Sequence, residues 1–314
     1  MNHFQRIISV VAGLLLLTLS HNALSYGIDI DTLSEEEMVH YDSIFQDSLR
    51  AYEKDLKKLQ DSILYSENPD ARADALTKYI PALVQALQVP GSIDYPFEDI
   101  EFMFTQTPED ESFRLYNWVM EFDDGGHRYY GAIQMNTTDE FKLFPLTDLS
   151  DDLPDKPDNM TLGHEEWYGA LYYEMVQIED GNNTYYTLLG WDGHDRTSQL
   201  KMVDVLTFDR FGNPQFGAPV FEVVDDEGDR RRQHRVFFQY SERAVMSMNV
   251  ADGTDIIVFD KLVPLAGNMP GGEQEMVPDG SYSSFVFESG LWRQVDQPFD
   301  TLDDLQGEDE QGGF

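Results

Sequence analysis

The chain has 314 residues and carries 59 acidic against 21 basic side chains, which gives a formal charge of −38 at pH 7. Its length is enough for one large domain or two modest ones. So negative a chain is repelled by nucleic acid and by anionic membrane surfaces, and neither is expected as a partner. Because it has no cysteine, it forms no disulfide, thiolate metal site, thiol nucleophile or lipidated N-terminus.

Residues 1–25 are predicted to be a signal peptide. Arg6 precedes the apolar run Ile7–Leu19, and Ala23-Leu24-Ser25 has the small-x-small pattern of a cleavage site. The run is short for a membrane span, although an uncleaved anchor is the alternative. We therefore expect an exported protein of the periplasm, cell surface or extracellular space, with no membrane association after signal cleavage.

Residues 26–92 are predicted to form a helical hairpin. Ser34 and Glu37 have the spacing of a capping box, and apolar residues then recur every three or four positions as far as Ile63. Asn68-Pro69 is typical of a second helix start. Pro81 is expected to bend or split that helix, and Pro90-Gly91 to end it.

From residue 93 to 297 the pattern predicts an antiparallel β domain. Its most regular part is three strands in a row, Tyr168–Ile178, Thr184–Trp191 and Gln199–Phe208, with turn residues between them. Aromatic and β-branched residues occupy the strands, while Gly, Asn and Asp occupy the joins. Further strands are predicted by the same pattern at 113–122, 128–135, 141–145, 219–224, 235–240, 245–250, 256–260, 282–288 and 291–295.

The connections include two long ones and a charged tip. Residues 146–166 are predicted to form a surface loop, and Asp225–Arg232 the tip of a hairpin. The acidic segment 298–314 has no periodicity and is predicted to be disordered. The fold class is therefore mainly β, an antiparallel up-and-down meander with an N-terminal two-helix hairpin; a barrel, a sandwich and a small propeller-like arrangement all fit.

Several of these segments resemble a family of exported, mostly β proteins of Gram-negative bacteria. The similarity rests on FRLYNWVMEF at 113–122, YYTLLGWDGHDRTSQLKMVDVLTFD at 185–209, GNPQFGAPVF at 212–221 and the hairpin containing Gly280-Ser281-Tyr282 and Leu291-Trp292. It covers residues 95–297. The resemblance implies export and a β fold, and it assigns no biochemical role and no catalytic or binding residue.

Calcium is the one cofactor that the sequence suggests. The acidic turns contain Asp192, Asp195, Asp225 and Asp229, and a further turn runs from Asp252 to Asp255. Carboxylates in Asp-Gly turns supply some of the six to eight oxygens that calcium takes. None of these turns has the full EF-hand pattern, and Asp and Gly also favour such turns for backbone reasons alone.

Candidate catalytic residues are His164 with Glu165, and His194 with Asp195. The zinc-protease spacing is absent because Tyr168 stands where a second histidine would be needed. His127 and His234 are isolated in sequence and would have to converge with a carboxylate in the fold. No Gly-x-Ser-x-Gly elbow, phosphate loop or dinucleotide fingerprint occurs.

The candidate ligand-binding residues are Trp191, Asp192, His194 and Arg196, because the polar loop after Trp191 is long for a hairpin. The four tryptophans are expected either to line a glycan or peptide groove or to fill the sheet core. The favoured function is a non-enzymatic binding or structural module with a protein or glycan partner. A hydrolase with dispersed His and carboxylate residues, and a calcium-stabilised adhesion or assembly domain, are the alternatives.

Overall fold

The structure is a computed structural model that describes residues 35–122, 125–137, 140–154, 156–224, 228–265 and 275–296. The predicted signal peptide, Ser34, Asp225 and the predicted tail lie outside these residues. The chain divides into two compact units. One comprises Met1–Met103, Ser112–Arg114 and Gln134–Leu143, and the other Phe104–Glu111, Leu115–Ile133 and Phe144–Phe314.

The predicted helical hairpin is confirmed. Its helices are α2 (Glu35–Tyr65) and α3 (Pro69–Leu87). Asn68 caps α3, since its side-chain Oδ1 accepts a hydrogen bond of 2.9 Å from the backbone N–H of Asp70. The apolar stripes of the two helices bury Leu49, Leu56, Tyr79 and Leu83, among others.

Helix α3 is not split at Pro81, contrary to one of the two outcomes expected there. The proline ring lies on the exposed side of the helix, where it does not disturb packing. Among the described residues, no helix combines the length and apolar character needed to cross a membrane.

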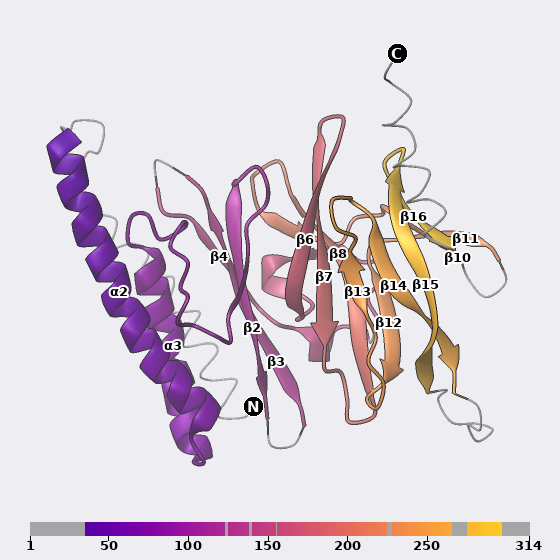
Figure 1. Ribbon diagram of the computed structural model, residues 1–314, viewed down its shortest axis with the longest axis horizontal. Helices are drawn as coiled ribbons and strands as arrows, with labels where there is room; N and C mark the ends of the chain where they lie inside the picture. The colour runs from indigo at the N-terminus through magenta and orange to yellow at the C-terminus, as the bar shows by residue number, and fades with distance from the viewer. Residues whose placement is uncertain are drawn as a thin grey trace. The chain divides into compact units, whose positions relative to one another are not determined.

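Three sheets account for the strands (Figure 1). The first sheet has the order β1-β2-β3-β4, with β1 (Phe104–Gln106), β2 (Phe113–Glu121), β3 (His127–Met135) and β4 (Leu143–Leu146). The central sheet has the order β5-β9-β8-β7-β6, and β12 also pairs with β8. Its strands are β5 (Leu162–Gly163), β6 (Leu171–Asp180), β7 (Asn183–Asp192), β8 (Ser198–Phe208), β9 (Pro214–Phe216) and β12 (Val236–Ser241).

The C-terminal sheet has the order β11-β10-β16-β15-β14-β13. Its strands are β10 (Phe221–Val224), β11 (Arg230–Gln233), β13 (Met248–Val250), β14 (Ile257–Pro264), β15 (Met276–Glu288) and β16 (Leu291–Asp296). Most neighbours in sequence pair antiparallel, as expected. Strands far apart in sequence also pair: β10 pairs with β16 in parallel, through Phe221 with Trp292 and Glu222 with Arg293.

The mainly β, antiparallel fold class is confirmed. The three strands predicted in a row correspond to β6, β7 and β8. Four short strands were not predicted: β1, β5, β9 and β11. Strand β5 and two 3₁₀ turns lie within 146–166, where only a loop was expected. Strand β11 is Arg-Arg-Arg-Gln, whose charges indicated a hairpin tip; it forms a strand because it pairs residue for residue with β10.

Of the three arrangements considered, the structure is a sandwich. The central and C-terminal sheets face each other across one apolar core, which includes Leu189, Val203, Phe259, Phe285 and Trp292. Within the described residues none of the three sheets closes on itself, so the barrel alternative is wrong. Figure 1 shows β6–β8 and β14–β16 as adjoining layers within the second unit.

Asn117 joins the first sheet to the central sheet. Its side chain is fully buried; Oδ1 accepts a 2.8 Å hydrogen bond from Tyr172 N–H, and Nδ2 donates one of 3.2 Å to Tyr172 C=O. Tyr172 lies where the register of β6 against β7 shifts before Glu174. The Asn117 amide therefore bonds both backbone hydrogen-bonding groups of Tyr172 next to the register shift.

We expect Asn117→Ala to lower the free energy of unfolding by about 2–4 kcal/mol, because it leaves two buried backbone groups of Tyr172 unpaired. Urea denaturation measures this loss. Asn249, which is exposed, is the matched control, and Asn249→Ala should change stability by less than about 0.5 kcal/mol. Equal effects of the two substitutions would contradict this role of Asn117.

Candidate functional site

Asp192, at the end of β7, is the centre of a polar cluster at the predicted ligand loop. Its carboxylate accepts hydrogen bonds from Tyr129 Oη at 2.9 Å, Tyr168 Oη at 2.6 Å and His194 N–H at 2.8 Å. The Tyr129 oxygen also accepts a bond of 2.7 Å from Gly193 N–H. Burial, and next the charge of Asp192, raise the pKa of Tyr129 well above its usual range, so this hydroxyl stays protonated and donates.

Asp195 organises the other half of the same loop. Its Oδ1 accepts hydrogen bonds from Thr197 N–H, Thr197 Oγ1 and Ser198 N–H at 2.6–2.8 Å. Burial acts against its charged form, but these hydrogen bonds from Thr197 and Ser198 hold the pKa of Asp195 below its usual value. Both loop carboxylates are therefore used to fold the loop.

His127 comes from β3 and packs against this loop, which the sequence did not indicate. A Cβ on Gly193 would lie 2.3 Å from His127 Cε1, so the ring lies directly on the Gly193 backbone. The ring also meets Trp191 edge-on, with centroids 5.6 Å apart. Its Nδ1 is buried and accepts or donates no hydrogen bond within the described residues.

The residues predicted to bind a ligand thus fall into two groups. Asp192 is buried and occupied by protein donors, and Trp191 is half-buried, with its Nε1 donating to Gln199 at 3.1 Å. Arg196 is exposed and its side chain lies against Gly125 in the β2–β3 turn. The other three tryptophans, Trp118, Trp167 and Trp292, are buried, as expected for side chains that fill the core and do not line a groove.

The histidines do not converge on one carboxylate. His194 Nε2 lies 3.7 Å from Asp195 Oδ2. His194 directly follows Gly193, whose backbone is in contact with the His127 ring. The other predicted pair is separate: His164 Nδ1 is 2.9 Å from Pro145 O and its ring meets Phe144, while Glu165 is exposed.

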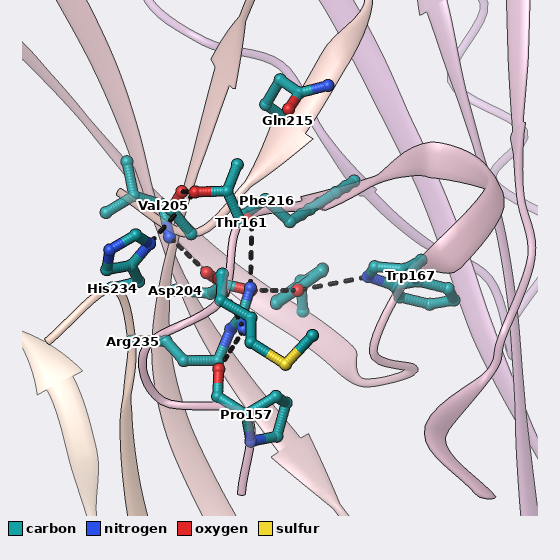
Figure 2. A network of polar contacts seen from close by, with 12 residues as sticks. Pro157, Thr161, Trp167, Asp204, Val205, Gln215, Phe216, His234 and Arg235 are labelled. Atoms are coloured by element: carbon teal, nitrogen blue, oxygen red, sulfur yellow. Dashed lines mark hydrogen bonds and ion pairs between the residues drawn. The ribbon is translucent and has the colours of Figure 1, made fainter. Parts of the chain in front are cut away.

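His234 lies in a different network, shown in Figure 2, with Thr161. The Thr161 hydroxyl donates to Gly217 C=O at 3.0 Å and lies 3.0 Å from His234 Nδ1. Because the hydroxyl proton is used on Gly217, Nδ1 carries a proton and is the donor. Burial, and next the charge of Arg235, lower the pKa of His234, which favours the neutral ring.

Beside His234, Arg235 and Asp204 form a completely buried ion pair (Figure 2), with Nε 3.1 Å from Oδ2. The remaining guanidinium N–H groups donate to the carbonyl oxygens of Pro157, Met160 and Phe216. Tyr172 Oη donates to the same Asp204 oxygen at 3.2 Å. With both charges bonded to several partners, this network holds the 157–160 segment against the central sheet.

No metal centre is formed by the described residues: nowhere do three or more His, Asp or Glu side chains come together as a metal would require. Of the predicted calcium ligands, Asp192 and Asp195 accept hydrogen bonds from protein donors, and Asp225 lies outside the described residues. Asp229 has partners of its own beside β11.

A pocket of about 430 Å³ lies elsewhere, at the β13–β14 turn. It is lined by that turn, residues 250–255, together with Glu109 and Glu174. The lining has four carboxylates, those of Glu109, Glu174, Asp252 and Asp255, and no basic side chain. Glu174 accepts a 3.0 Å hydrogen bond from Val250 N–H, while Glu109, Asp252 and Asp255 are exposed and form no ion pair with any described residue.

The sequence missed this pocket for a simple reason. Asp252 and Asp255 stood out only as a possible calcium turn, and Glu109 and Glu174 belong to segments far away along the chain. The acidic turn can be recognised in the sequence, but no feature of the neighbouring residues indicates that it lies beside Glu174. The bulge that follows Tyr172 in β6 comes just before Glu174, and no pattern of period two predicts it.

Comparison with known proteins yields no match: no family model, curated protein or solved structure is similar to this chain. The family resemblance of residues 95–297 therefore stays a prediction.

We expect Gly193→Ala to destabilise the loop, because the added methyl would overlap the His127 ring. The loss in unfolding free energy should be about 1–3 kcal/mol, the usual range for overpacking. In a His127→Ala background the same substitution should cost much less, since the clashing ring is gone. Urea denaturation of the two single variants and the double variant tests this, and strictly additive losses would contradict the contact.

We expect Arg235→Met to cost about 3–5 kcal/mol in unfolding free energy, because it leaves Asp204 charged and buried without its partner. Removing both charges in Arg235→Met/Asp204→Leu should cost less than the sum of the single variants. The exposed pair of Lys78 and Asp74 is the control, and Lys78→Met should cost less than about 1 kcal/mol. Additive single losses, read from urea midpoints, would show that the pair is not coupled.

Proposed function

We propose that this protein is an exported, non-enzymatic binding module whose acidic pocket at the β13–β14 turn takes a positively charged group of a protein partner. A lysine or arginine side chain of a peptide segment has the positive charge that complements the acidic residues lining the pocket. Export rests on the signal-peptide pattern of residues 1–25 and places the protein in the periplasm, at the cell surface or outside the cell.

The observation that carries the proposal is the lining of the pocket. Four acidic residues and no basic residue line one volume of about 430 Å³. Exposed like charges repel one another, and most strongly at low salt. A cationic side chain entering the pocket relieves this repulsion and forms charge-assisted hydrogen bonds with the carboxylates.

The polar residues first considered for catalysis support a binding role in a second way. Asp195, His164 and His234 each make hydrogen bonds that hold loops in place. A catalytic acid or base must instead reach a substrate proton in a cleft. Three of the four carboxylates around the pocket, those of Glu109, Asp252 and Asp255, are exposed and form no ion pair with any described residue.

Titration with a tetralysine peptide tests the proposal by calorimetry on the full chain. We expect Asp252→Asn/Asp255→Asn to weaken binding at least about fivefold, since two of the four charges are lost. Asp42→Asn/Asp94→Asn removes two exposed aspartates outside the pocket and should weaken binding less than about twofold.

The control separates a site from the general attraction of a chain with 59 acidic residues to any cation. If both double variants lose the same affinity, the peptide binds the surface at large and the proposal is wrong. The difference between the variants should persist at 0.3 M salt, where diffuse attraction is screened over a few ångströms.

A further inference from the structure

Lys201 has an unusual position for a lysine, in the middle of β8 on the face that closes the sandwich core. Side chains two residues apart share one face of a strand. Val203 and Val205 on this strand belong to the core between the central and C-terminal sheets. Lys201 continues their row toward the start of β8, so its side chain begins on the core side of the strand.

Aromatic residues surround this lysine. Its cross-strand neighbours are Trp191 on β7 and Phe238 on β12. Phe238 packs on Phe259 of the facing sheet, with ring centroids 4.7 Å apart. The Lys201 ammonium lies 4.0 Å from the centroid of the Tyr173 ring, whose hydroxyl is fixed by a 2.9 Å bond to Met248 C=O.

No carboxylate offsets the charge of this lysine. Among the described residues Lys201 forms no ion pair, although the chain has 59 acidic side chains. Glu174 of β6 has its Oε2 engaged by Val250 N–H, and Asp260 of β14 is engaged by Ser247 N–H. Burial lowers the pKa of Lys201 from its usual 10.5 to about 8.

We propose that Lys201 is a site of covalent capture for small uncharged aldehydes, which it binds as an imine. The inference is independent of the acidic pocket. The lone pair of the neutral amine attacks the carbonyl carbon, a C–N bond forms and the carbonyl oxygen takes a proton. Loss of the hydroxyl as water, with the second amine proton, then leaves the C=N bond, so that amine and aldehyde give imine and water.

The surroundings select which carbonyl compound reacts. A desolvated lysine in an apolar setting is nucleophilic because a larger fraction of it is neutral. The Tyr173 ring face stabilises the cationic iminium form as it does the ammonium. Anionic aldehydes are disfavoured by the negative charge of the chain, and large ones by the packed aromatic rings.

The ordinary alternative is a lysine whose stem covers apolar surface while its amine reaches water. Such an amine reacts no faster than any exposed lysine. Lys54 on α2 supplies the comparison within the same molecule, because it is exposed and forms no ion pair within the described part of the chain. The experiment therefore needs no variant, and misfolding cannot confuse it.

The full chain is treated with glycolaldehyde and borohydride at pH 8, and labelling of each lysine is followed by peptide mass spectrometry. At this pH the neutral fraction of Lys201 exceeds that of an ordinary lysine roughly a hundredfold. Allowing for its partial burial, we expect Lys201 to be labelled at least about tenfold faster than Lys54. The ratio should fall toward one near pH 10.5, where an ordinary lysine is half deprotonated.

Equal labelling of Lys201 and Lys54 at pH 8 would overturn the proposal. So would labelling of Lys201 that begins only in urea, since the amine would then be shielded in the folded protein. Tyr173→Leu removes the ring below the amine and should change the rate at Lys201 while leaving the rate at Lys54 unchanged.

Discussion

The central sheet depends on the buried ion pair of Asp204 and Arg235. Two charges without any exposed surface are stable only if all their hydrogen-bonding groups find partners, because the cost of desolvation otherwise exceeds the attraction between them. Here the partners are backbone carbonyls of the 157–160 segment and Phe216, together with the Tyr172 hydroxyl. The pair therefore determines where an irregular segment lies on the sheet, which apolar packing alone would not specify.

Tyr172 connects this ion pair to other parts of the structure. Its hydroxyl receives a 3.3 Å hydrogen bond from Trp167, and its ring stacks on Phe216 with an interplanar angle of 4°. Its backbone is bonded by Asn117 of β2. One residue thus links the ion pair, the first sheet and the irregular step in β6, while the opposite face of the same sheet closes the sandwich core.

The parts of the fold that the sequence predicted are those governed by local pattern. Strands β6, β7 and β8 are rich in aromatic and β-branched residues and are joined by turn residues, so their boundaries follow within a few positions. Strand β11 was missed because three arginines have low strand preference, and only pairing with β10 makes them extended. The parallel contact of β10 with β16 joins residues some seventy positions apart, and no local signal encodes it.

The site was harder to predict than the fold for the same reason. The sequence marked the loop after Trp191 as long and polar, but one of the donors that occupy Asp192 is Tyr129, 63 residues earlier in the chain. A carboxylate in a turn looks the same in sequence whether a tyrosine satisfies it or not. Only the fold reveals which of 59 acids are already engaged.

That distinction decides how the acidic character of this chain should be interpreted. Glu53, Asp192 and Asp204 are buried and bonded to tyrosine hydroxyls, so they are structural elements rather than parts of a solvated coat. Other described acids, such as Asp42 and Asp94, are exposed apart from one another, where water and salt offset their charge. Glu109, Asp252 and Asp255 belong to neither group, because they are unpaired within the described residues and gather with Glu174 around one volume. Grouped like charges oppose folding unless something else compensates them, and a cationic ligand is the compensation that the geometry of this pocket admits.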